Sequence, residues 1–350
     1  MNSCLSPRNG RGFQACADLE MQMLRLFFEM DAVGVAAGVA VLRAASQGES
    51  VSRPRRALLF LVADGGEGPE GWERVYQEAR SEGDPEVGAA ACIAAVDATL
   101  GKGRGFDAWA PWCGRLADLL VSGVDMSAQA RAALHLRRGL IAMLRDGDAG
   151  AAERAAAASL SLVDAGQSLP LALALGALVG LTDCLAGHVV RADVRLSDAA
   201  FLCHRGASGV LPRALALSTL GLVKLLLGDA EAASRMLDRV RHDAAAGSLP
   251  ECLLLLVEGH RLYAATALGM VHTVQDLADR IGGRVRPARN LLLEAYRHLA
   301  LGAVALRSGQ ALRALVHAQE SLDCGRRAAA QFPVLVAALL QLQALADLHR

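Results

Sequence analysis

Glu294 and His298 form a residue pair whose types and spacing suit metal binding. Residues four apart lie on the same face of a helix, so the carboxylate and the imidazole could share one ion. The sequence places no second pair of ligands beside them, and a structural role within a helix is the favoured interpretation. We therefore predict no metal site in this protein.

Asp183, Cys184 and His188 suggest a second chemistry, a thiol nucleophile with a neighbouring base. Cys184, however, lies in a helix that leads into a turn, and His188 follows the turn glycine. A core thiol and a turn histidine are therefore the favoured interpretation. Cys203 and His204 are sequence neighbours, and adjacent residues of a helix point about 100° apart, which suits proton transfer badly.

Two further patterns argue against catalysis. The eight cysteines form no CxxC pair and mostly lie in apolar helical stretches, which is typical of small core residues. Gly101-Lys102-Gly103 lacks the earlier glycine and the following Ser or Thr of a phosphate-binding loop. We predict no catalytic residue, no cofactor and no enzyme activity, with an unrecognised helical active site as the least favoured alternative.

One aromatic group and one arginine group are the candidates for binding a partner. Trp109 and Trp112 form a dense aromatic group with Phe106, and buried aromatic side chains often dominate binding energy. Core packing between helices is their alternative role, and it is favoured. An arginine-rich linker could hold an acidic peptide or a phosphate, against the default of a solvated loop; it contains Arg280, Arg284, Arg286 and Arg289.

The composition indicates an all-α fold that would position these residues. Hydrophobic residues make up 53% of the 350 residues and aromatic residues only 4%. The apolar content is mostly Ala, Leu and Val, and Ala and Leu are the strongest helix formers. No repeated run alternates apolar with polar residues at period two, so a sheet is not expected.

Charge and hydropathy bound the partners and the compartment. The 36 basic and 36 acidic residues cancel, so no overall field attracts nucleic acid or an anionic membrane. Residues 1–20 lack the unbroken apolar segment of a secretory signal. The longest uncharged apolar stretch, 169–182, contains Pro170 and is shorter than the roughly 20 residues of a membrane-spanning helix. We expect a cytoplasmic protein.

A repeat of about forty residues organises the chain. Turn glycines recur at steps of 40, 41, 41 and 40 residues: Gly147, Gly187, Gly228, Gly269 and Gly309. Five residues after each comes a small apolar residue: Ala152, Ala192, Ala233, Val274 and Ala314. Seven residues before the glycine, three units have another glycine: Gly180, Gly221 and Gly302. Small residues at such positions let helices approach closely.

Each unit predicts one helical hairpin, because a proline that suits the first turn of a helix precedes each first apolar run. Hairpins stacked side by side bury faces that a single hairpin exposes. We divide the chain into a tail and capping helix (1–50), degenerate hairpins (51–126) and regular repeats with an unpaired C-terminal helix from Pro333 (127–350). In the degenerate part, 54–62 would pair with 72–80, and 85–100 with 106–121. The total is about seven hairpins.

Gly302, Gly309 and Ala314 resemble the small-residue core of a tetratricopeptide repeat, as do Gly221, Gly228 and Ala233. The units are about six residues longer than the usual 34 and lack the usual tryptophan of the first helix. Longer units of this kind are similar to the helical repeat region of LuxR and maltose-activator transcriptional regulators, and 106–120 looks like a recurring segment there. The phosphate-binding loop and helix-turn-helix of those regulators are absent from this sequence.

These patterns predict a non-catalytic scaffold or sensor. The expected α-solenoid of hairpins would hold a protein, a peptide or a small inducer by shape on a concave face formed largely by the first helices. The alternative is a signal-sensing fragment of a LuxR or maltose-activator regulator without its ATPase and DNA-binding parts. Self-association through the apolar C-terminal helix is a further expectation.

Overall fold

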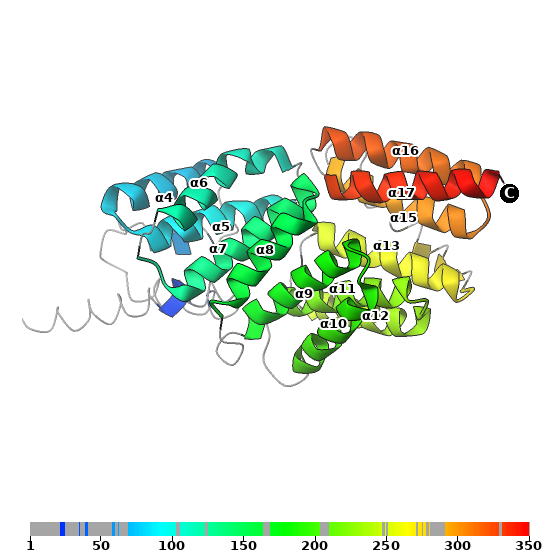
Figure 1. Ribbon diagram of the computed structural model, residues 1–350, viewed down its shortest axis with the longest axis horizontal. Helices are drawn as coiled ribbons and strands as arrows, with labels where there is room; N and C mark the ends of the chain where they lie inside the picture. The colour runs from blue at the N-terminus through cyan, green and yellow to red at the C-terminus, as the bar shows by residue number, and fades with distance from the viewer. Residues whose placement is uncertain are drawn as a thin grey trace, which may run out of the picture.

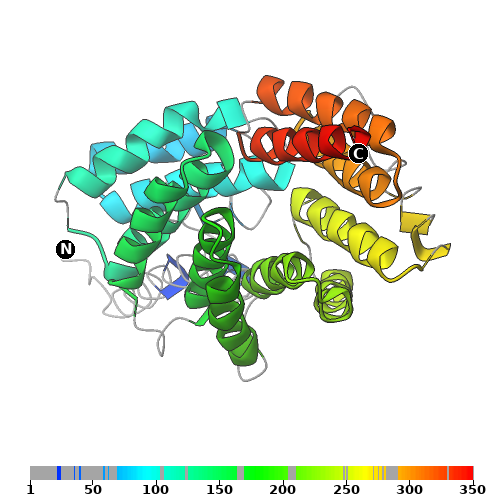
Figure 2. The same ribbon diagram turned by 45° about the vertical axis from the view of Figure 1, so that its right-hand side comes forward.

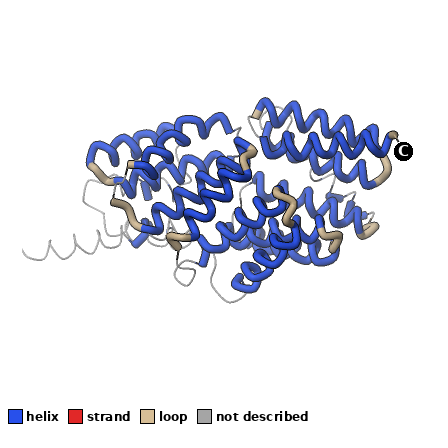
Figure 3. The backbone as a smooth tube through the Cα atoms, in the orientation of Figure 1, coloured by secondary structure: helices blue, strands red, loops and turns tan. Residues whose placement is uncertain are grey.

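The computed structural model describes residues 22–24, 35, 39–40, 58–59, 62, 69–102, 106–122, 125–163, 169–203, 210–246, 249, 251–270, 272–274, 276–277, 280, 291–328 and 331–349. These residues form helices and short loops without a strand (Figures 1 and 3). In chain order the helices are α4 (Pro69–Glu82), α5 (Pro85–Lys102), the 3₁₀ helix η1 (Phe106–Trp109), α6 (Ala110–Val121), α7 (Ala128–Ile141), the π-helix η2 (Ala142–Asp146), α8 (Ala149–Leu160), α9 (Leu169–Leu185), α10 (Val189–Cys203), α11 (Val210–Leu226), α12 (Ala230–Ala246), α13 (Glu251–Ala267), α15 (Leu291–Arg307), α16 (Ala311–Arg327) and α17 (Gln331–Leu348).

A left-handed glycine ends each of the predicted first helices. The φ angle lies between +68° and +83° at all five predicted turn glycines: Gly147, Gly187, Gly228, Gly269 and Gly309. Residues with a Cβ are strained in this conformation. After Gly228, the backbone N–H of Asp229 donates to the carbonyl oxygen of Lys224 at 2.9 Å, as in a Schellman turn. The predicted repeat of turns is confirmed.

Glycines inside the first helices bring paired helices into close contact. A Cβ added to Gly180 on α9 would lie 2.5 Å from Cδ1 of Leu196 on α10, and one on Gly221 would lie 2.9 Å from Leu237 on α12. Carbon atoms normally pack at about 3.5–4.0 Å, so only glycine fits here. The interpretation of these glycines as close-approach positions is confirmed.

The first regular repeat has a glycine in a related position beside a π-helical insertion. This glycine is Gly139, eight residues before Gly147 instead of seven, and a Cβ there would lie 2.6 Å from Leu178 on α9 and 3.4 Å from Ala155 on the paired helix α8. The extra residue is taken up by η2. Correspondingly, the N–H of Asp148 donates to Ala142 six residues earlier, whereas the other turns use a carbonyl five residues earlier. The sequence pattern at seven residues missed Gly139.

The N-terminal hairpins pair differently from the sequence-based prediction. α4 packs most extensively on α5 across Gly83, which has φ +69° and was not singled out from the sequence. Asp84 then caps α5, because its Oδ1 accepts the N–H of Val87 at 3.2 Å. α6 lies against α5 and α7 as an additional helix. The expected capping helix and most of 54–62 lie outside the described residues.

The repeats curve until the C-terminal part touches the N-terminal part (Figure 2). α17 packs on η2, and a Cβ on Gly147 would lie 3.2 Å from side-chain atoms of Gln331 and Leu335. α13 contacts α5, and one hydrophobic cluster joins Trp109 to Leu262. The described fold is an all-α solenoid of stacked antiparallel hairpins, as predicted, in which α17 packs against η2 and α13 against α5.

Candidate interaction surfaces

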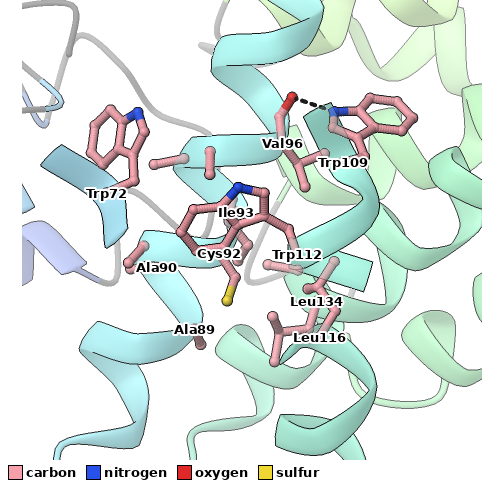
Figure 4. Close-up of a cluster of buried hydrophobic side chains, with 14 of the residues drawn as sticks. Trp72, Ala89, Ala90, Cys92, Ile93, Val96, Trp109, Trp112, Leu116 and Leu134 are labelled. Atoms are coloured by element: carbon pink, nitrogen blue, oxygen red, sulfur yellow. Dashed lines mark hydrogen bonds between the residues drawn. The ribbon is translucent and has the colours of Figure 1, made fainter. Parts of the chain in front are cut away.

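Trp109 and Trp112 lie in the hydrophobic core (Figure 4). Trp109 is fully buried, and its Nε1 donates to the backbone oxygen of Val96 at 3.2 Å. Trp112 is 4% exposed and meets the ring of Tyr76 edge-on, with centroids 6.1 Å apart. Neither indole is accessible to a partner in this fold, so the alternative of core packing describes both, and we do not retain them as binding residues.

Arg115 extends the aromatic group of Trp112 toward the surface. Its guanidinium lies 4.8 Å from the ring centroid of Tyr76 and 4.6 Å from that of Trp112. It also donates to both carboxylate oxygens of Glu73, at 2.5 and 2.8 Å. The cation–π contacts and the bidentate ion pair of Arg115 stabilise the packing of α6 on α4. Tyr76, Trp112 and Arg115 therefore have a structural role between two helices.

The predicted arginine-rich linker is described only at its start. Arg280 is partly buried, and its Nε donates to the backbone oxygen of Asp276 at 3.3 Å. Arg284, Arg286 and Arg289 lie outside the described residues. Binding of an acidic group by this linker stays a prediction.

The nucleophile hypothesis at Cys184 does not match the geometry. Burial raises the pKa of the Cys184 thiol to about 11, and the charge of Asp183 adds to that effect. Asp183 is buried and forms ion pairs with Arg191 and with Arg195, the latter at 3.1 Å. His188 is exposed in the turn. A thiol with so high a pKa is a poor nucleophile near neutral pH, so these residues are structural.

Glu294 and His298 belong to a hydrogen-bonded chain between α15 and α16. Arg297 donates to Glu294 at 2.8 Å and to Nε2 of His298 at 2.9 Å, and Nδ1 of His298 lies 3.1 Å from Nδ1 of His317. Because arginine only donates, Nε2 of His298 accepts, so its Nδ1 carries the proton that His317 accepts. Burial lowers the pKa of both histidines, that of His317 to about 4. Within the described ranges, no three His, Cys, Asp or Glu side chains converge as a metal site.

Four of the first helices offer little surface to a ligand. In the described parts of α9, α11, α13 and α15, the only exposed residues are Leu226 and Arg307, each the last of its helix. Neighbouring helices cover most of the other residues. Binding of a partner on a concave face stays a prediction.

The second helices carry the exposed surface, and α10 shows an apolar stripe there. Val190, Val194 and Phe201 are 69%, 60% and 56% exposed, and their spacing of four and seven residues places them on one helix face. The opposite face buries Ala192, Leu196, Ala199 and Ala200. The glycines of α9 leave room for this face: an added Cβ on Gly180 would collide with Leu196, and one on Gly176 would lie in ordinary contact, 3.6 Å from Ala199.

Ion pairs fix α10 in this orientation. Arg191 and Arg195 reach back to Asp183 on α9, and Lys224 on α11 lies 2.6 Å from Asp193. These charged groups flank the apolar stripe and hold the helix from both sides. The sequence-based prediction missed this surface, although the apolar spacing from Val190 to Phe201 was a readable signal.

Comparisons with known proteins agree with the fold. No protein-family model matches this sequence, and no curated protein matches it. Among 21 matching solved chains is one in the crystal structure of the APC/C hetero-tetramer Cut9–Hcn1, with a TM-score of 0.56 and 16% identity over 91% of this chain. A tetratricopeptide repeat protein from Parabacteroides merdae aligns with 95% of this chain and 99% of its own length at 9% identity, but its TM-score of 0.43 is too low for conclusions.

The structural similarity defines a class of fold. The chain has the architecture of tetratricopeptide-like solenoids, and it spans about half, 54%, of the Cut9–Hcn1 chain that it matches. The resemblance to LuxR and maltose-activator regulators stays a prediction. Separately, no helix in the described portion of the chain is both long and apolar enough to cross a membrane.

Proposed function

We propose that this protein is a non-catalytic scaffold that binds a protein or peptide partner on the outer face of its second helices. The apolar stripe of Val190, Val194 and Phe201 on α10 carries the proposal. Solenoids of this class commonly present extended binding surfaces. Exposed valine and aromatic side chains in a row are unfavourable in water, and a partner that covers them gains hydrophobic free energy.

The partner that suits this stripe has apolar side chains at helical or extended spacing. Arg191 and Arg195 border the stripe and remain about half exposed while paired with Asp183, so acidic groups at the edge of the partner would be favoured. We keep the arginines of the 280–289 linker as a second proposed contact for an acidic partner. The chemistry is recognition by shape, with no covalent step.

The test combines affinity capture with a matched pair of variants. Proteins retained from the source cell are identified by mass spectrometry, and the enriched partner is then titrated against the purified chain. Val194→Asp should weaken binding at least tenfold, because an exposed anchor becomes charged. Val121→Asp, at an exposed valine at the end of α6, serves as the control. Equal affinity of both variants would contradict the assignment of the α10 stripe.

Two other hypotheses have distinct tests. A signal-sensing fragment of a LuxR or maltose-activator regulator would be encoded beside ATPase and DNA-binding segments, so genomic context separates it from an independent scaffold. Turnover in a broad hydrolase and phosphatase screen would contradict the non-catalytic assignment. We also propose a cytoplasmic location and self-association through α17.

A further inference from the structure

The outer face of α17 is an uncharged leucine surface. Residues 331–346 contain no charged side chain. Five leucines of this helix are between 42% and 64% exposed: Leu335, Leu339, Leu342, Leu345 and Leu348. At 100° per residue, Leu335, Leu339 and Leu342 lie within about 60° of one another, and Leu345 and Leu348 turn from them toward the side of Gln341, which faces α16. The side opposite the first three leucines, with Ala337 and Ala344, packs into the solenoid.

The leucine surface continues onto α16. Nε2 of Gln341 donates to Oε1 of Gln319 at 2.9 Å, which fixes the register of the two antiparallel helices. Following each helix from this pair in opposite directions brings Val316 beside Leu345, and then Leu312 beside Leu348. Leu312 and Val316 are 69% and 61% exposed. We call the seven residues Leu312, Val316, Leu335, Leu339, Leu342, Leu345 and Leu348 the α16–α17 face.

The position of α17 in the repeat explains why this face is apolar. By order and packing α17 is a first helix, since it follows α16 and contacts both α15 and α16. The first helices α9, α11 and α15 are each covered by a second helix, namely α10, α12 and α16. Among the described helices, η2 lies against α17 near Leu335, and none covers the other four leucines of α17 in the same way. The α16–α17 face is therefore suited to pack against further helices.

We infer that the α16–α17 face binds the same face of a second copy of this chain. Two identical surfaces meet across a two-fold axis only if they do not repel each other, and the uncharged stretch 331–346 of α17 satisfies that condition, while the exposed α16 residues Arg313, Glu320 and Asp323 border it with both signs of charge. Helices of 17 and 18 residues are about 26 Å long, and two packed helices are about 20 Å across. The projected area of such a face is about 520 Å², below the roughly 800 Å² per partner of a standard interface, so we expect a weak dimer that depends on concentration.

The two-fold arrangement makes Leu342 its central contact. Leu342 lies at the middle of the exposed stripe from Leu335 to Leu348, so an antiparallel pairing of α17 with its copy brings the two Leu342 side chains together. The result is a four-helix bundle of two α16–α17 pairs. This inference deepens the proposed self-association and does not depend on the partner of the α10 stripe.

The experiment measures the mass of the full 350-residue chain by light scattering and sedimentation velocity over a wide concentration series. The unaltered chain should dimerise, and Leu342→Arg should raise the dissociation constant at least about 100-fold, because like charges would meet in an apolar interface. A mixture of Leu342→Arg with Leu342→Glu should form the dimer again, since opposite charges then face each other. Val121→Arg, at an exposed valine at the end of α6, should dimerise as the unaltered chain does.

Three results would overturn the inference. The first is an unaltered chain that stays monomeric at high concentration. The second is a Leu342→Arg variant that dimerises normally, which would assign the dimer to another surface. The third is a mixture of the two charge variants that stays monomeric while circular dichroism shows both variants folded. If the chain fails to dimerise but still binds its partner through the α10 stripe, the dimer is refuted and the proposed partner binding is not.

Discussion

The close approach of α9 and α10 at Gly180 leads to a quantitative prediction. A Cβ in Gly180→Ala would lie 2.5, 2.7 and 3.0 Å from Cδ1, Cγ and Cδ2 of Leu196. Leu196 is fully buried and has no route to solvent. Overpacking of this kind lowers the free energy of unfolding by about 1–3 kcal/mol, whereas the better helix propensity of alanine raises it by at most about 1 kcal/mol. We expect a net destabilisation of about 1–2 kcal/mol.

A double-mutant cycle tests this contact directly. Leu196→Ala alone should cost about 2–5 kcal/mol, because it leaves a cavity. Combined with Gly180→Ala it should cost less than the sum of the single changes by about 1–3 kcal/mol, since the added methyl group then fills space instead of colliding. The assay is urea unfolding followed by circular dichroism at constant pH.

Gly114→Ala is the control for the propensity term. Gly114 is also helical, in α6, but a Cβ there has no atom within 4 Å. That variant should be stabilised by up to about 1 kcal/mol. Additivity of the two α9–α10 changes within about 0.5 kcal/mol would refute the close approach of these helices at Gly180.

Further outcomes follow from turns, buried charge and histidines. Gly228→Ala should destabilise the protein by about 1–2 kcal/mol because φ is +83°, even though no atom lies near the added Cβ. Thermal unfolding should show a smaller loss for Gly228→Asn, because asparagine tolerates this φ better than alanine. Asp183→Asn should cost about 1–3 kcal/mol in urea unfolding, because Arg191 and Arg195 lose a buried charged acceptor; an unchanged midpoint would contradict this. Burial lowers the pKa of His260 to about 4, below its unfolded value of 6.5, so the neutral form is favoured in the folded state. Its contribution to stability should be complete above pH 6.5 and be lost as the pH falls to about 4, and His260→Gln should flatten that part of the stability profile.

Local chemistry explains which features the sequence predicted well. The turn glycines were found because a positive φ is required at each helix end, and glycine meets that requirement at Gly187 or Gly228 whatever the surrounding repeats do. Gly139 was not predicted because η2 lengthens the spacing between this glycine and the turn glycine from seven residues to eight. The stripe on α10 was missed because an amphipathic pattern suggests that the larger side chains are buried, whereas α10 buries Leu196 with three alanines and exposes Val190, Val194 and Phe201.

The sequence by itself determined that the chain is helical, that hairpins repeat about every forty residues and where the repeats turn, since each of these depends on residues within a few positions of one another. The tertiary structure alone decided that α17 reaches η2 and that the first helices α9, α11, α13 and α15 are mostly covered by their neighbours. The curvature of a solenoid is the accumulated rotation between successive repeats. Small packing differences at each interface between repeats set that rotation, so the overall curvature cannot be predicted from the sequence of any one repeat.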